Sequence, residues 1–350
     1  MGDSGIGDYR FTVTGYAGLQ GEVLRLRNAN RPVAQTAAYL DWRYSGPTGA
    51  PDPKLFWIND ATGRSVGMAA LIFRPFWIDG EPQHVAVLGD ISLDAALRGK
   101  GLGRSLLKFM TEHLDGDHAD CLTLVIPNEA ARRALTSVGW TTAGSLIPYV
   151  FALNPGEKLL GLLKSPAIAK VAAWPISALL KRMIRRHRKA GYALSILDEP
   201  NGSFDAFWKR YPKASAILSD RATKTLRWRY QSHPERGFKF AKLVHEDQFA
   251  GYLVYKVSQP MRVCTIYDCI LLENGDLGCM LALFVAHCAD LGGIDTIRLM
   301  LNGGHPYGER LWKLGFIARQ DSGTFQLYGP KAQARLRESK WFLTYGDKDI

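Results

Sequence analysis

The sequence has few cysteines, no metal-binding spacing and no apolar run long enough to cross a bilayer. Its five cysteines are scattered, and none has the CxxC spacing or the histidine neighbours of a zinc site. We therefore expect no metal centre and interpret the thiols as buried core residues in a reducing compartment. The N-terminus lacks the basic and apolar regions of a signal peptide, so we expect a cytoplasmic protein.

The net positive charge is small outside one segment. The formal net charge is +11, and residues 158–197 contribute nine Lys or Arg without any Asp or Glu. A nucleic-acid-binding protein more often spreads its cations over a groove-fitting face, with aromatic side chains among them. We therefore expect no nucleic-acid partner.

Apolar residues, in contrast, are plentiful, and the chain repeats itself. Hydrophobic residues make up 47% of the sequence, enough for the cores of two domains. The segment Leu40–Tyr44 (LDWRY) recurs as Leu226–Tyr230 (LRWRY). After each copy, the apolar spacing predicts the same order of strands and helices, with Asp90 and Asp268 on matching strands. The repeat predicts two α/β domains of one fold.

The halves and the segment between them give three predicted regions. We expect domains over residues 1–150 and 192–350, joined by a basic amphipathic helical linker over residues 151–191. Two interpretations of the basic part, residues 158–189, stay open. Its apolar stripe packs on the tandem core, or the segment lies on an anionic membrane surface, which would make the protein peripheral at the inner face.

Only the first half contains a glycine-rich loop between a predicted strand and a predicted helix. The loop reads Arg98-Gly99-Lys100-Gly101-Leu102-Gly103. Glycines let backbone N–H groups approach a pyrophosphate, and the following helix N-terminus adds positive potential. Arg98, Lys100 and Arg104 supply charge, and Ser105 supplies a hydroxyl. The frame fits neither a P-loop nor a dinucleotide fingerprint. We predict a phosphate cradle; the alternative is a tight turn that binds no anion.

The loop and its surroundings resemble a known family. Residues Ile91–Leu107 look like motif A of GNAT-family acetyltransferases, and residues Val125–Trp140 are similar to their motif B. The resemblance implies an α+β fold of two tandem GNAT-like domains, each with a mixed, mostly antiparallel central sheet flanked by helices. In the second half Leu272–Gly278 replaces the loop, and its acidic residues would repel a pyrophosphate.

The resemblance also implies a cosubstrate, acetyl-CoA or another acyl-CoA, and the residues that bind it. The backbone of Ile91 and Leu93, with Ser92 between them, would hold the pantetheine arm, and one of these amides would polarise the thioester carbonyl. Asn128 would contact the CoA chain. The pyrophosphate would be held by Arg98, Gly99, Lys100, Gly101, Leu102, Gly103, Arg104 and Ser105.

The implied reaction is transfer of acetyl to an amine of a small molecule or sugar, by direct attack in a ternary complex. Many family members carry a tyrosine that protonates the leaving thiolate where this chain has Leu135. Tyr149 is the nearest alternative donor, or it is a strand residue packed on the sheet. Asp90 is the candidate base, or a structural residue bonded to the turn or to the Trp42–Tyr44 segment, since Asp268 recurs in the second half. The competing hypothesis is a catalytically silent protein that binds acyl-CoA, a membrane surface or a protein partner.

Overall fold

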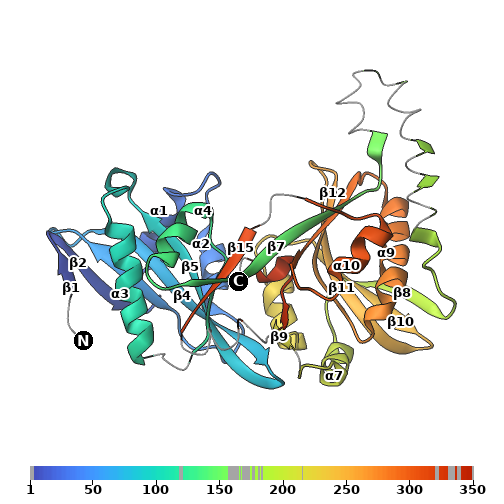
Figure 1. Ribbon diagram of the computed structural model, residues 1–350, viewed down its shortest axis with the longest axis horizontal. Coiled ribbons are helices and arrows are strands. Elements are labelled where there is room, and N and C mark those ends of the chain that lie inside the picture. Colours follow the sequence, from blue (N-terminus) through green and yellow to red (C-terminus); the bar gives the residue numbers. More distant parts are fainter. Residues whose placement is uncertain are drawn as a thin grey trace.

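The computed structural model describes residues 4–117, 121–156, 184–214, 216–319, 323–329 and 340–348, together with residues 165, 167, 174–175, 178–179, 182 and 336. Most of the basic part of the predicted linker, residues 158–189, therefore lies outside the described residues. Both halves of the chain, and the crossing strands between them, are visible in Figure 1.

The first half is built around a long antiparallel hairpin of β4 (Ser65–Ile78) and β5 (Glu81–Leu93). β4 is an almost continuous apolar run because helices cover both faces of the sheet, and most of its side chains are buried. The remaining elements are β1 (Ser4–Ile6), β2 (Tyr9–Thr14), α1 (Gln20–Asn28), α2 (Ala37–Ser45), β3 (Lys54–Asn59), α3 (Leu102–Asp117), β6 (Thr123–Val125), α4 (Glu129–Thr136) and β7 (Thr141–Ala152).

The second half repeats this order, as the sequence predicts. α7 corresponds to α1, the β10–β12 meander to β3–β5, and α9 to α3. Its elements are β8 (Tyr192–Leu197), α7 (Gly202–Arg210), β9 (Ala216–Ser219), α8 (Thr223–Leu226), β10 (Phe238–His245), β11 (Gln248–Ser258), β12 (Val263–Leu271), α9 (Leu277–Leu291), β13 (Thr296–Asn302), α10 (Gly308–Leu311), β14 (Ile317–Ala318), β15 (Gly323–Tyr328) and β16 (Lys340–Phe342).

The two halves exchange their last strands. β7 of the first half pairs antiparallel with β13 of the second, from Leu146 opposite Asn302 to Ala152 opposite Thr296. In return, β15 inserts between β6 and β7. Among the described residues, all strands consequently belong to one continuous sheet, with the crossing of β7 and β15 at its centre (Figure 1).

The repeated tryptophans meet where the halves face each other. The rings of Trp42 and Trp228 stack with centroids 5.3 Å apart and 14° between their planes. Each indole N–H donates to the other tryptophan's carbonyl, at 2.7 Å from Trp42 and 3.1 Å from Trp228. The reciprocal contacts make this pair a local two-fold junction between the repeats.

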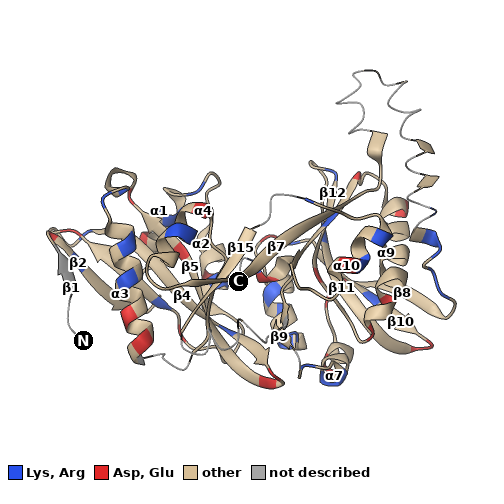
Figure 2. Cartoon of the chain, viewed as in Figure 1, with Lys and Arg blue, Asp and Glu red and all other residues tan. Residues whose placement is uncertain are grey.

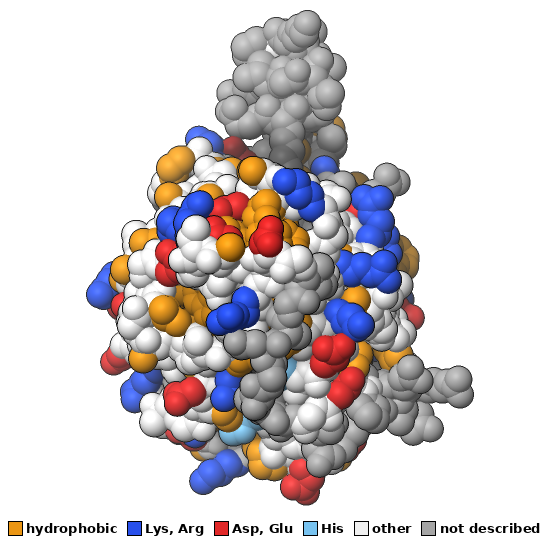
Figure 3. Space-filling model, turned by 90° about the vertical axis from the view of Figure 1, so that its left-hand side faces the viewer, with side chains coloured by type: hydrophobic (Ala, Val, Ile, Leu, Met, Phe, Trp, Pro, Cys, Tyr) orange, Lys and Arg blue, Asp and Glu red, His pale blue; other side chains and the backbone are white. Residues whose placement is uncertain are grey.

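The outer face of the first half carries interspersed basic and acidic side chains over its described part (Figure 3).

Candidate active site

The first half opens where β5 separates from β6. These parallel strands pair at Ala86 with Thr123 and at Val87 with Leu124, and the described residues show no pairing beyond that point. A bulge in β5 accompanies the separation, with Asp90 in the left-handed region at φ 57°. The edge of β5 that follows Val87 is thus left free for a ligand that needs backbone partners.

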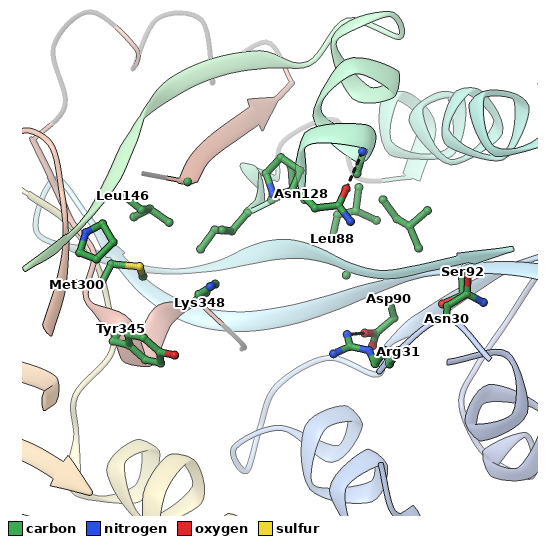
Figure 4. Close-up of a pocket in the computed structure, with 18 of the residues that line it drawn as sticks. Asn30, Arg31, Leu88, Asp90, Ser92, Asn128, Leu146, Met300, Tyr345 and Lys348 are labelled. Carbon is green, nitrogen blue, oxygen red and sulfur yellow. Dashed lines mark hydrogen bonds and ion pairs between the residues drawn. The ribbon is translucent and has the colours of Figure 1, made fainter. Parts of the chain in front are cut away.

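A cavity of about 710 Å³ fills this opening, called the β5–β6 cavity from here on. Asn30 and Ser92 lie at one end, and Leu88, Asp90 and Asn128 lie around the middle (Figure 4). The far end is formed by Leu146, Met300, Tyr345 and Lys348. Both halves of the chain therefore line one cavity, a consequence of the strand exchange.

The glycine loop forms the turn that starts α3. Gly99 and Gly101 have φ of 79° and 83°, a conformation that favours glycine. A Cβ at either position would meet no atom within 4 Å, so the space outside the loop is open. Among the described residues, the backbone N–H groups of residues 99–103 have no backbone acceptor. The loop therefore has the open space and unpaired donors that an anion needs.

The charges along α3 run against its dipole. Arg104 and Lys108 lie in its first two turns, and Glu112 and Asp115 lie toward its end (Figure 2). Helices are stabilised by acidic residues near the N-terminus and basic residues near the C-terminus, so this arrangement costs stability. A bound anion at the start of α3 would offset that cost.

The structure places the predicted cofactor residues in two groups. Ile91, Ser92 and Asn128 line the β5–β6 cavity, whereas Leu93 and the residues 98–105 lie beyond it. A hydrogen bond joins the groups: the Arg98 guanidinium donates to the Asn30 side-chain oxygen at 2.6 Å, and Asn30 lines the cavity.

Two predicted cofactor residues already use part of their side chains inside the protein. The Asn128 side-chain oxygen caps α4 by accepting from the Ala131 N–H at 2.9 Å, which leaves its amide group as the donor for a ligand. The Ser105 hydroxyl donates to the Gly101 carbonyl at 3.3 Å.

Asp90 is buried in a cluster of cations. Its carboxylate pairs with Arg27 at 3.0 Å, Arg43 at 3.1 Å and Arg31 at 3.3 Å, and it accepts from the Tyr44 hydroxyl at 2.7 Å. Burial by itself raises the pKa of Asp90, but Arg43, Arg27, Tyr44 and Arg31 together lower it to about 2. The expected contact with the Trp42–Tyr44 segment is therefore present, and Asp90 is a weak base at neutral pH.

The matching aspartate of the second half has the same kind of partner. Asp268 accepts from Arg221 through both carboxylate oxygens, at 2.9 and 3.0 Å, in a fully buried pair. An aspartate on this strand is therefore held by arginine in both repeats, whether or not a glycine loop follows. This supports the structural alternative for Asp90.

Tyr149 lies away from the cavity. Its strand neighbours Pro148 and Val150 line the cavity, whereas its own ring packs in the core of the second half. A Cβ built on Gly308 would lie 3.2 Å from the Tyr149 hydroxyl. Burial raises the pKa of Tyr149. Its position does not support the predicted role as proton donor to a thiolate in the β5–β6 cavity.

In the second half, the chain itself occupies the place of the phosphate cradle. The Asp276 carboxylate, just before α9, accepts from Lys189 at 2.9 Å and from the Tyr192 hydroxyl at 2.8 Å. A Cβ on Gly278 would lie 3.0 Å from the His187 ring. The sequence predicted repulsion of a pyrophosphate by acidic residues here. The structure adds a steric reason, because the end of the basic linker covers the start of α9.

Sequence reasoning missed the far end of the cavity. Arg298, Tyr345 and Lys348 line it together with Arg31 and Asn30 near the bulge. None belongs to the glycine-loop pattern. The exchange of β7 and β15 brings these second-half residues to the opening of the first half, and no local signal in the sequence indicates that exchange.

Comparison with known proteins identifies the first half. Residues 22–140 match the model of the acetyltransferase (GNAT) family. The first half is a GNAT domain. Members of this family use an acyl-CoA, and the match includes the glycine loop and Asn128. A search of curated proteins finds no match to the sequence.

Solved structures share the fold over almost the whole chain. A GCN5-related N-acetyltransferase from Anabaena variabilis has a TM-score of 0.64 at 12% identity, covering 91% of this chain and 72% of its own. A tandem GNAT protein of the clavulanic acid biosynthesis pathway gives 0.56 at 14% identity, with 91% and 98% covered. The N-myristoyltransferase of Saccharomyces cerevisiae, with bound myristoyl-CoA, gives 0.57 at 10% identity, with 93% and 83% covered. The fold is therefore a tandem GNAT fold.

The described residues were also searched for metal-binding clusters and for membrane-spanning helices. No group of three or more His, Cys, Asp or Glu among them could hold a metal ion. None of the helices they form is both long and apolar enough to span a bilayer.

Proposed function

We propose that the chain is an acyl-CoA-dependent N-acyltransferase whose one active site lies in the first half. The observation that carries this proposal is the loop at residues 98–103, with its free backbone N–H groups at the start of α3. The Arg98–Asn30 hydrogen bond connects that loop to the β5–β6 cavity. The cofactor is acetyl-CoA or a related acyl-CoA, with its pyrophosphate at the loop and its pantetheine arm along the free edge of β5.

The chemistry requires little from ionisable side chains. A backbone N–H of Ile91 or Leu93 would polarise the thioester carbonyl toward the attacking amine. With a pKa of about 2, Asp90 is poorly suited to take the amine's proton, so the amine arrives neutral or loses its proton to water. The thiolate leaves unassisted, because a thiol with a pKa of roughly 8.5 is a tolerable leaving group. In this account Asp90 is a positioning residue that holds the bulged segment in place.

The acceptor is an amine of a small molecule or sugar that enters at the far end of the cavity. Residues of both halves line that end, including Leu146 of β7 and Met300 of β13. This supports an acceptor site at the junction of the halves, separate from the loop that holds the pyrophosphate.

Titration with acetyl-CoA, followed by a thiol-release assay on a panel of amines, tests the proposal. We expect saturable binding and release of CoA that depends on the amine. No binding below about 1 mM would overturn the proposal. Binding without release for any amine would favour the alternative of a silent acyl-CoA-binding protein.

We also propose that the basic segment 158–189 contacts an anionic membrane surface. Two described residues support this, since Trp174 is 75% exposed and Leu179 is 58% exposed, although Ile184 is buried against the second half. Flotation with phosphatidylserine vesicles should weaken in a Trp174→Ser, Leu179→Ser variant. The matched control is Trp312→Ser, which alters an exposed tryptophan elsewhere. Equal flotation of both variants and the parent would contradict surface contact.

A further inference from the structure

Two cations at the far end of the β5–β6 cavity flank one aromatic ring. The Arg298 guanidinium carbon lies 5.8 Å from the centre of the Tyr345 ring, and the Lys348 ammonium lies 5.9 Å from the same centre. All three residues line the cavity. They come from β13 and from the turn after β16, so the second half supplies this group of charges.

A hydrogen bond from its Nε holds the Arg298 side chain in position. Its Nε donates to the Thr265 hydroxyl at 2.7 Å, which fixes the plane of the guanidinium. Within the described part of the chain, neither Arg298 nor Lys348 has a carboxylate within ion-pair distance. The described residues offer no partner to its two terminal nitrogens, and an oriented guanidinium of this kind suits a carboxylate or phosphate, which it can bind through two parallel hydrogen bonds.

Among the described residues, the carboxylates nearest to this group already pair with other arginines. Asp347, adjacent to Lys348, is buried and pairs with Arg221 and Arg229. Asp90, the carboxylate that lines the cavity, is shared by Arg27, Arg31 and Arg43. The described residues of the far end consequently present more positive than negative charge to the cavity.

We propose that the acceptor amine also carries an acidic group, a carboxylate or a phosphate, which Arg298 and Lys348 bind. This inference rests on the proposed function, since it specifies the second substrate of the same site. The apolar wall of Leu146, Val150 and Met300 would contact the spacer between the acidic group and the amine. The acidic group anchors the acceptor at the far end and directs its amine toward the bulge in β5.

Matched pairs of amines test this inference. The pairs are 5-aminopentanoate with its methyl ester, and phosphoethanolamine with ethanolamine. Binding to the CoA-saturated protein is measured by ligand-observed NMR, and CoA release is measured with acetyl-CoA. We expect the acidic member of at least one pair to bind about 10- to 100-fold more tightly than its neutral partner, as charge-assisted hydrogen bonds allow. The pair that shows the preference distinguishes a carboxylate from a phosphate.

Variants then locate the preference. Arg298→Gln and Lys348→Gln should each reduce it, mainly through a higher KM, and should leave the affinity for acetyl-CoA unchanged. Arg227→Gln is the matched control, because Arg227 is exposed and lies outside the β5–β6 cavity. No acidic preference in either pair, or a preference that survives Arg298→Gln, would overturn the inference. Failure of acetyl-CoA binding would instead count against the proposed function, and the NMR comparison without CoA would still report on the far end.

Discussion

At the scale of single residues, the partners of Asp90 favour the structural interpretation over the catalytic one. Its type and strand position are those of a catalytic carboxylate, and the sequence leaves both interpretations open. The decisive information is the set of partners, because three arginines and a tyrosine hydroxyl surround the carboxylate. These partners come from α1, the segment after it and α2, and their convergence depends on tertiary packing.

Replacing Asp90 by Asn should lower stability more than it lowers the intrinsic rate of acyl transfer. The change leaves Arg27 and Arg43 buried without a counter-charge, which costs about 3–5 kcal/mol. Urea unfolding at pH 7 measures this loss, with Asp8→Asn at an exposed position as control. Unchanged stability with a lost transfer rate would contradict the structural role.

The difference in unfolding free energy between the parent and Asp90→Asn should depend on pH. The folded pKa of Asp90 is lowered from its ordinary value of 3.8 to about 2. Its stabilisation is therefore complete above about pH 4 and is lost as the pH falls through 2. The stability difference between the parent and Asp90→Asn should narrow between pH 4 and pH 2.

At the scale of elements, the exchange of β7 and β15 determines which residues form the far end of the β5–β6 cavity. The alternation along β7 puts Pro148 and Val150 toward the cavity and Tyr149 toward the core of the second half. The sequence could not show this, because residues 146–152 are apolar on both sides of β7 and leave no polar side to fix its orientation. The glycine loop was predictable, since its residues are contiguous and the flanking strand and helix have clear periodicity.

The Trp42–Trp228 pair should contribute strongly to the junction of the halves. Trp42→Ala removes a stacked ring and leaves the Trp228 carbonyl without its indole donor, so we expect a loss of about 3–5 kcal/mol. Thermal unfolding measures the change, and Trp174→Ala at an exposed position is the control. Equal melting temperatures for the two variants would contradict a structural role for the pair.

At the scale of the whole molecule, the two copies of the fold differ at the start of the helix that follows the central strands: the glycine loop of the first half is open, and the matching place in the second half is covered. The internal repeat, the order of elements and the missing second loop could all be read from the sequence. The covering of the α9 start by His187 and Lys189 could not, because it joins segments about 90 residues apart without a shared motif. The sequence could not show either that Arg298 and Lys348 lie at one end of the cavity, because their place there depends on how the two halves fold together.

The central claim is that only one of the two halves binds acetyl-CoA. Calorimetric titration with acetyl-CoA tests it most directly. We predict one bound molecule per chain, and an affinity reduced at least about 10-fold by Gly101→Val, whose side chain would occupy the open space of the loop. Gly63→Val is the matched control, because Gly63 has φ of 84° and equally open surroundings in a turn away from the loop. Two molecules bound per chain, or equal affinity in the two variants, would contradict the account.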